Sequence, residues 1–371
     1  MKVATILGTR PEIIRLSRVI AALDRYTEHV LIHTGQNYDY ELNQVFFEDL
    51  EIRCPDHFLQ AAGKNAAETI GLVISKSSEV LAKVQPDAVL ILGDTNSCLA
   101  ALAAKRMKIP VFHMEAGNRC FDERVPEEIN RKIVDHISDI NLPYSDISRE
   151  YLLREGIAPD RVIKTGSPMY EVLHHYLQRI KKSDVLERLG LNSNEYFVVS
   201  CHREENADVP RQLERFVQLL DWLAEEFGLR IIVSTHPRTK KRLKELGAML
   251  RPEVELRAPL GFLDYVQLEM NARATLSDSG TISEESSILG FAALNIREVH
   301  ERPEAMEEAA VILTGFDCAR VREGLKILEN KGKTGLRVVR DYEAPAVSEK
   351  VVRIIHSYVN YVNSVVWRKV E

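Results

Sequence analysis

Residues 3–12 read Val-Ala-Thr-Ile-Leu-Gly-Thr-Arg-Pro-Glu, and this stretch decides the fold prediction. Its first five residues lack the polar alternation of a half-exposed strand, so they predict a strand that is covered on both faces. Gly8 then ends the strand, and Pro11 stands where the first turn of a helix is expected. The segment therefore predicts a buried strand that passes directly into a helix.

Short β-branched runs alternate with amphipathic helical stretches along the rest of the chain. This alternation is typical of parallel sheets that carry helices on both faces. The series occurs twice, once in each half of the sequence. The expected strands are Val3–Leu7, Val30–His33, Ala88–Leu92, Val111–His113, Ile140–Pro143, Tyr196–Ser200, Arg230–Thr235, Glu253–Arg257, Ala274–Leu276, Ala293–Ile296 and Val311–Leu313.

The length of the chain favours two domains, because a single core rarely keeps growing in a chain of 371 residues. The break between the two series falls near Thr165–Pro168. We therefore predict an α/β protein with two Rossmann-like domains that face one another across a cleft. We expect the N-terminal domain at 1–168 and the C-terminal domain at 169–356. The final helix, at 357–371, is expected to pack back on the N-terminal domain.

The composition excludes several classes of protein. A net charge of −6 gives no support for binding to nucleic acid. Five scattered cysteines indicate reduced thiols, and no stretch of 18 apolar residues predicts membrane insertion, so we expect a cytoplasmic protein. No Gly-x-Gly-x-x-Gly string follows a strand, which disfavours a nicotinamide dinucleotide fold. His174 and His175 have no third ligand at a suitable spacing, so no metal site is expected.

Polar side chains follow the expected strands of the first half, and parallel sheets bind ligands at this edge. Arg10 would point a fork of donors at an anion, unless it is simply solvated. Asp94 is either an acid–base group or the cap of the next helix. Glu115 lies in a segment expected to be half-buried, where a carboxylate needs a partner. The candidate partners are His113, Arg119 and Arg131.

Two more carboxylates and two histidines extend this set. Glu127 and Glu128 either take part in acid–base chemistry or only favour a helix N-terminus. Clustered carboxylates push one another's pKa values apart, which would provide one acid and one base. His202 follows the first strand of the second half, where it is either structural or catalytic. His236 follows the next strand and is a weaker candidate of the same kind.

The segment Ser277–Ser286 has the pattern of a phosphate site. Its Ser279-Gly280 turn opens an expected helix, where unpaired N–H groups and the helix dipole suit an anion. Arg302 precedes a proline further along the chain, and it either closes around a nucleotide or pairs with Glu301. The sequence therefore predicts phosphate binding in the second domain and acid–base chemistry in the first.

Six motifs in this order resemble the non-hydrolysing UDP-N-acetylglucosamine 2-epimerase family. The resemblance runs from Lys2 to about Val311 and implies the glycosyltransferase-B architecture of two Rossmann-like domains. One departure is Thr281, which stands where the family usually has a second glycine after Asp-Ser-Gly. The motifs are Gly8-Thr9-Arg10-Pro11-Glu12, Gly93-Asp94-Thr95, His113-x-Glu115-Ala116-Gly117-x-Arg119, Pro126-Glu127-Glu128-x-Asn130-Arg131, Asp278-Ser279-Gly280 and Glu301-Arg302-Pro303-Glu304.

The resemblance implies inversion at C2 of a UDP-2-acetamido sugar, through elimination of UDP to a glycal and its re-addition. No metal or redox cofactor is implied, and a homodimer is expected. The implied acid–base residues are Asp94, Glu115, Glu127 and His202, and the implied UDP contacts are Arg10, Ser279, Gly280 and Glu285, with Glu285 on the ribose hydroxyls. Weaker substrate contacts are expected from Arg15, Arg119, Arg131, His236 and Arg302.

Finer features resemble the UDP-N-acetyl-L-fucosamine synthase branch of this family. They are the strings at 33–40, 165–169 and 202–206, together with Arg15 where the UDP-N-acetylglucosamine enzymes usually have lysine. The branch substrate is UDP-2-acetamido-2,6-dideoxy-L-talose, and its product enters capsule or O-antigen synthesis. The alternatives are a UDP-N-acetylglucosamine 2-epimerase that makes UDP-N-acetylmannosamine, a glycosyltransferase of the same architecture, and a nucleotide-sugar sensor.

Overall fold

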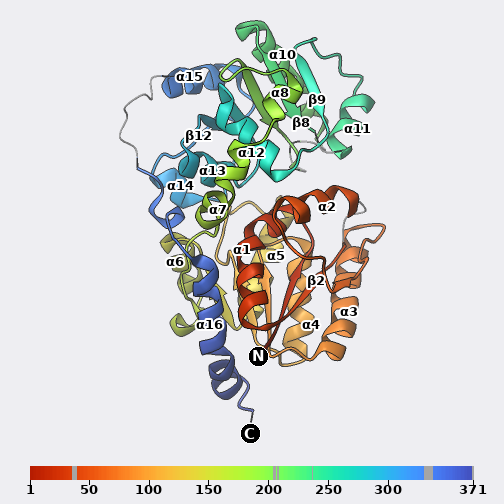
Figure 1. The fold of residues 1–371 in the computed structure, drawn as a ribbon, viewed down its shortest axis with the longest axis vertical. Helices are drawn as coiled ribbons and strands as arrows, with labels where there is room; N and C mark the ends of the chain where they lie inside the picture. The colour runs from red at the N-terminus through yellow and green to blue at the C-terminus, as the bar shows by residue number, and fades with distance from the viewer. Residues whose placement is uncertain (36–39, 204–205, 207–208, 236, 330–336, 370–371) are drawn as a thin grey trace. The chain divides into compact units, whose positions relative to one another are not determined.

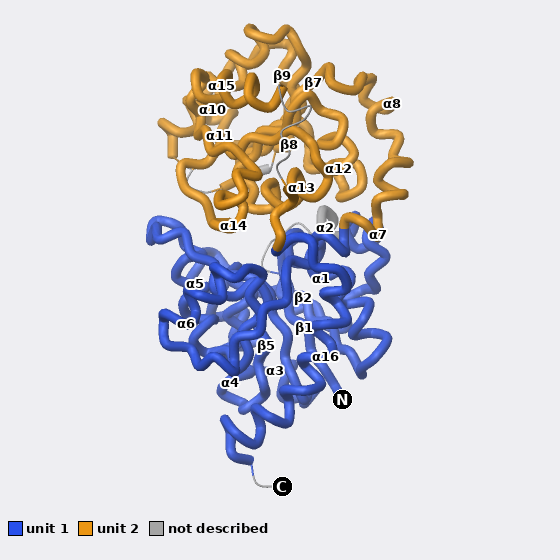
Figure 2. Tube along the Cα trace, turned by 90° about the vertical axis from the view of Figure 1, so that its left-hand side faces the viewer, with its two compact units in different colours: residues 1–172, 341–371 blue, residues 173–340 orange. Residues whose placement is uncertain are grey.

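The computed structural model contains two six-stranded sheets, and every strand pair in them is parallel. It describes residues 1–371 except 36–39, 204–205, 207–208, 236, 330–336 and 370–371 (Figure 1). The chain divides into two compact units: unit 1 comprises residues 1–172 and 341–371, and unit 2 comprises residues 173–340 (Figure 2). The α/β fold with two Rossmann-like domains is therefore confirmed.

Unit 1 holds the sheet with the strand order β3-β2-β1-β4-β5-β6. Its strands are apolar and fully buried at the centre, because helices cover both faces. The strands are β1 (Lys2–Leu7), β2 (Glu28–His33), β3 (His57–Phe58), β4 (Ala88–Leu92), β5 (Val111–Met114) and β6 (Ile140–Leu142), and the helices are α1 (Arg10–Tyr26), α2 (Tyr40–Asp49), α3 (Ala66–Val84), η1 (Asn96–Ala100), α4 (Ala101–Arg106), α5 (Pro126–Ile137), α6 (Asp146–Arg154), η2 (Pro159–Arg161), α16 (Val347–Tyr361) and η4 (Val362–Val366).

Unit 2 repeats this design with the strand order β12-β11-β10-β7-β8-β9. Its core lies between the sheet and α10 and α15. The strands are β7 (Tyr196–Ser200), β8 (Arg230–Ser234), β9 (Val254–Arg257), β10 (Ala274–Ser277), β11 (Ala293–Asn295) and β12 (Ile312–Leu313), and the helices are α8 (Val185–Leu189), α10 (Pro210–Phe227), α11 (Pro237–Glu245), α12 (Phe262–Asn271), α13 (Ile282–Leu289), α14 (Pro303–Glu307) and α15 (Cys318–Glu329), while α7 (Met169–Lys181) and η3 (Arg340–Tyr342) cross the unit boundaries.

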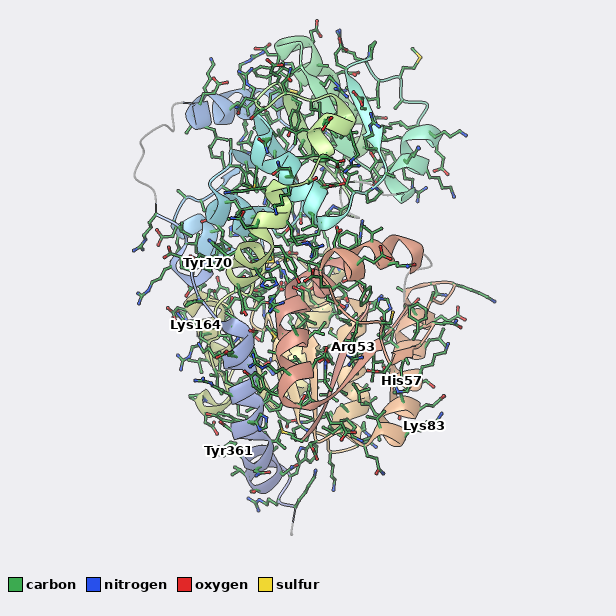
Figure 3. All side chains as sticks on the ribbon, viewed as in Figure 1. Arg53, His57, Lys83, Lys164, Tyr170 and Tyr361 are labelled. Atoms are coloured by element: carbon green, nitrogen blue, oxygen red, sulfur yellow. The ribbon has the colours of Figure 1, made fainter. Side chains whose placement is uncertain are left out.

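The C-terminal segment joins unit 1 earlier than we expected from the sequence, since residues 341–356 also belong to it. Helix α16 runs beside α1 (Figure 1). Lys164, labelled in Figure 3, forms an ion pair with Asp341 at 2.8 Å, and Lys350 donates a hydrogen bond to the Lys164 carbonyl. Tyr361, also labelled there, donates a hydrogen bond to Asp160. These contacts tie the segment to unit 1 along its length.

In both sheets the order of the strands along the chain reverses between the two central strands. Ligands bind at such switch points in open α/β sheets. In unit 1 the switch point lies between β1 and β4, and in unit 2 it lies between β7 and β10. The loops that follow these four strands therefore position the candidate site residues. Among the described helices, none has the length and hydropathy that a membrane-spanning helix requires.

Candidate active site

Unit 1 brings three of the expected residues to one edge of its sheet. Arg10 begins α1 directly after β1, Asp94 follows β4, and Glu115 follows β5. These strands are neighbours in the sheet, so the three residues leave adjacent carboxyl ends. The Arg10 guanidinium lies 5.7 Å from the centre of the Phe46 ring, which is a cation–π distance.

Glu115 pairs with an arginine that the sequence patterns did not single out as its partner. Arg15 on α1 forms an ion pair with the Glu115 carboxylate, and Asn118 donates a hydrogen bond to its other oxygen at 3.2 Å. Only 10% of the Glu115 side chain is exposed. Its φ of 64° lies in the left-handed region, which is uncommon for a residue with a side chain and is found at functional sites.

Asp94 is held in place by the motif at the start of α5. The Arg131 Nε and Nη2 atoms lie 3.0 and 2.6 Å from one oxygen of the Asp94 carboxylate. Arg131 also donates to Glu128 at 2.8 Å, and Asn130 donates to the Asp94 carbonyl at 2.9 Å. Because Arg131 and Glu128 are buried, they position Asp94. Glu127 is half-buried, so it retains exposed surface.

Arg119 does not reach the sheet edge where we expected a substrate contact. Its buried guanidinium donates to Asp135 at 2.7 Å and to Glu155 at 2.6 and 2.8 Å, and none of its side chain is exposed. His113 Nδ1 lies 2.9 Å from the same Asp135 carboxylate. Burial alone would raise the pKa of Asp135, but the His113 and Arg119 charges lower it below its ordinary value. This buried network is linked to Glu115 through Asn118, whose carbonyl accepts from Arg119 and whose side-chain amide donates to Glu115.

Glu12 is a further buried carboxylate at this edge, and we did not assign it a role from the sequence. It accepts hydrogen bonds from the Gly8 and Thr9 amides at 2.5 and 3.2 Å and from the Thr95 hydroxyl. Burial raises its pKa to about 7, although these donors act in the opposite direction. It joins the loop of Arg10 to the loop of Asp94. A glutamate at the third helical position is the available sequence signal.

In unit 2, Asp278 fixes the loop that carries His202. The Asp278 carboxylate accepts hydrogen bonds from the His202 and Arg203 amides at 3.0 Å and from the Asn206 side chain at 3.1 Å. His202 Nδ1 lies 3.1 Å from the same group. Burial would raise the pKa of Asp278, but the His202 charge and the donors lower it below its ordinary value. The His202 side chain remains 38% exposed.

The Ser279-Gly280 turn follows β10, and α13 begins two residues later. A Cβ atom at Gly280 would lie 3.6 Å from a Glu301 oxygen, so the turn lies beside this carboxylate. Arg203 and Arg297 share Glu301, at 3.0 and 3.2 Å. Two guanidinium groups therefore lie near this turn, and guanidinium groups bind phosphate oxygens well.

The remaining candidates have mixed placements. Glu285 on α13 is 6% exposed and accepts a hydrogen bond from Thr281 at 3.1 Å. Arg302 is 4% exposed, and its guanidinium lies 3.5 Å from the Glu284 carboxylate. His236 lies outside the described residues. Within the part of the chain that the structure describes, no group of three or more His, Cys, Asp or Glu side chains could hold a metal ion.

Comparisons with known proteins show which family the sequence matches. The sequence model of the UDP-N-acetylglucosamine 2-epimerase family matches residues 21–356. A UDP-N-acetylglucosamine 2-epimerase of Methanocaldococcus jannaschii is 37% identical over 360 residues, which cover 92% of this chain and 98% of the relative. A UDP-2,3-diacetamido-2,3-dideoxy-D-glucuronate 2-epimerase of Pseudomonas aeruginosa is 33% identical, with 85% and 88% covered.

Two solved structures resemble the whole chain. The structure of a UDP-N-acetylglucosamine 2-epimerase from Rickettsia bellii has a TM-score of 0.91 and 53% identity, and the match covers 100% of both chains. The Methanocaldococcus jannaschii enzyme, solved in complex with UDP-GlcNAc and UDP, has a TM-score of 0.90 and 35% identity, with 96% of this chain and 100% of that chain covered.

Proposed function

The chain belongs to the UDP-N-acetylglucosamine 2-epimerase family, and we propose that it inverts C2 of UDP-2-acetamido-2,6-dideoxy-L-talose to give UDP-N-acetyl-L-fucosamine. It is an isomerase, and more narrowly a UDP-sugar 2-epimerase. The choice of the talose derivative as substrate rests on the branch motifs of the sequence. The product would serve surface polysaccharide synthesis in the cytoplasm, and we propose a homodimer as the working form.

One observation supports the chemistry most strongly: Asp94 and Glu115 leave neighbouring strands, and each is paired with an arginine. Their side chains remain 20% and 10% exposed, so they are accessible to a ligand. Two carboxylates in different surroundings can differ in proton affinity, as an acid and a base must. A sensor that only binds its ligand would have no use for such a pair.

The proposed reaction begins when a base removes the C2 proton of the sugar. The electrons of the C–H bond form a C1=C2 double bond, and the C1–O bond breaks with its electron pair on UDP. UDP then adds back to C1 while a proton is delivered to the opposite face of C2. We propose that Asp94, Glu115, Glu127 and His202 supply the acid–base groups for these two steps.

The site must retain UDP between the two steps, because UDP that dissociates cannot add back to C1 of the glycal. We propose that Ser279 and Gly280 hold the diphosphate, Glu285 the ribose hydroxyls, and Arg10 the departing charge. Arg15 would act through Glu115 and Arg131 through Asp94, as their ion pairs favour. Arg302 would contribute through Glu284.

UDP-N-acetylglucosamine is the second candidate substrate, and it is supported by the relatives. The enzymes of Methanocaldococcus jannaschii and Neisseria meningitidis were solved with UDP-GlcNAc bound. The two candidates differ at C6, where the talose derivative has no hydroxyl group. The Pseudomonas aeruginosa relative is named for a third UDP-sugar, so membership of the family does not identify the substrate.

Proton NMR of the purified protein in D2O distinguishes the candidates. Each UDP-sugar is incubated separately, and the C2 proton signal and the epimeric product are followed. Deuterium at C2 of the talose derivative, with UDP-N-acetyl-L-fucosamine forming, supports the proposal. Exchange with UDP-N-acetylglucosamine alone assigns the chain to the mannosamine route, and no exchange with either contradicts an epimerase of these sugars.

A further inference from the structure

Thr281 connects the two residues of unit 2 to which we assign the phosphate and ribose contacts. Its Oγ1 atom lies 2.9 Å from the Ser279 hydroxyl and 3.1 Å from the Glu285 carboxylate. The Thr281 amide also lies within hydrogen-bond distance of the Ser279 hydroxyl, at 3.3 Å. One side chain therefore contacts both ends of this part of the site.

The chemistry of the three groups fixes the direction of the hydrogen bonds. An ionised carboxylate only accepts, so Thr281 donates its single hydroxyl proton to Glu285. The Thr281 oxygen can then only accept from Ser279, whose own oxygen accepts from the Thr281 amide. Burial and then the Glu285 charge raise the pKa of the neighbouring Glu269 well above its ordinary value.

The backbone accommodates this side chain without strain. Thr281 has φ −79° and ψ −20°, which is an ordinary right-handed conformation at the N-cap of α13. The family usually has glycine here, which offers no hydroxyl. Glu285 is 6% exposed, so a donor for its carboxylate has to come from the protein or the ligand.

We propose that Thr281 is a positioning residue that couples the Ser279 hydroxyl to the Glu285 carboxylate, so that the phosphate and ribose ends of UDP bind cooperatively. The inference rests on the proposed roles of Ser279 and Glu285 in UDP binding. Thr281 holds the Glu285 carboxylate in one rotation, ready for the ribose hydroxyls.

The test measures the affinities of UDP and 2′-deoxy-UDP by calorimetry, because the second ligand lacks one ribose hydroxyl. Thr281→Val deletes the hydroxyl at nearly constant volume and is expected to weaken UDP binding about tenfold. The preference for UDP over 2′-deoxy-UDP should shrink in this variant, since Glu285 is no longer held. Thr281→Ser keeps the hydroxyl and should restore both the affinity and the preference.

Ser287→Ala is the matched control, because its hydroxyl lies on the same helix and accepts a hydrogen bond from the Val339 amide at 3.1 Å. It should leave UDP affinity unchanged. Weaker UDP binding by Thr281→Val with an unchanged preference would mean a purely structural role and overturn the coupling. Equal binding by wild type and Thr281→Val would overturn it too. Failure of the wild type to bind UDP contradicts the proposed function itself.

Discussion

Replacing Glu12 with glutamine is expected to stabilise the folded protein above neutral pH. Glu12 is 2% exposed, and the donors to its carboxylate are neutral: two backbone amides and the Thr95 hydroxyl. A glutamine oxygen can accept from the same amides, and its NH2 group can donate to Thr95. The substitution therefore removes a buried charge and keeps the shape of the site.

The size of the effect follows from the pKa of Glu12, which burial raises from 4.5 to about 7. A difference of about 2.5 pKa units corresponds to about 3 kcal/mol. Below pH 4.5 the side chain is protonated in both the folded and unfolded states. Between pH 4.5 and 7 the unfolded state ionises while the folded state keeps its proton, so this contribution to stability is lost across that window and levels off once the folded state also ionises. Glutamine has no proton to lose, so its relative stability should rise by about 3 kcal/mol between pH 4.5 and pH 8.

Urea unfolding of both proteins from pH 5 to pH 8.5 measures this difference, and titrations elsewhere cancel in it. The chain has two tryptophans, so a Trp222→Phe background leaves Trp367 to report on unit 1. Glu68→Gln is the matched control, since Glu68 caps α3 in the same way but is exposed. A difference between Glu12→Gln and wild type that stays flat with pH would refute the reasoning.

Three further substitutions test the two units separately. Glu115→Gln should reduce turnover by at least about 100-fold. UDP affinity, measured by calorimetry, should not change, because the proposed UDP contacts are mostly in unit 2. Lost UDP binding with an intact fold would make Glu115 a binding residue. Asp278→Asn should lower the stability of unit 2 by about 1–3 kcal/mol, read from Trp222 fluorescence, and raise the Kd for UDP. Arg119→Met should cost about 3–5 kcal/mol in unit 1, since the substitution removes a buried guanidinium that pairs with the buried Asp135 carboxylate. A loss below about 1 kcal/mol would contradict this.

The strands were predictable because each is a short apolar run that both layers of helices cover. Two strands, Ala88–Leu92 and Tyr196–Ser200, have the bounds that the sequence indicates. The expected bounds of the other predicted strands differ from the observed ones by one or two residues. The two-residue strand His57–Phe58 was not predicted, since two residues carry no periodicity. The positions of Asp94 and Glu115 at strand ends followed directly from these runs.

The partners of the site residues were less predictable than their positions. The sequence indicated three candidate partners for Glu115, all within 20 residues, but the arginine that pairs with it lies 100 residues earlier, on α1. Such a contact depends on β1 lying next to β4 and β4 next to β5, which local patterns do not specify. The buried placement of Arg119 was also not predicted, because its partners Asp135 and Glu155 come from α5 and from the end of α6, which the residues around Arg119 do not specify.

Both units use a buried carboxylate to fix the loop after their first strand, but the pKa values of these two carboxylates shift in opposite directions. The carboxylate is Glu12 in unit 1 and Asp278 in unit 2. Each accepts hydrogen bonds from the amides that follow the first strand of its sheet. Each thereby ties this loop to the loop on the other side of the switch point. Glu12 has only neutral donors, so burial dominates and its pKa rises to about 7. Asp278 has His202 beside it, so its pKa falls below the ordinary value. Raising the pH should therefore reduce the stability of unit 1 through Glu12, whereas lowering it should reduce that of unit 2 through Asp278, and the two tryptophans report these transitions separately.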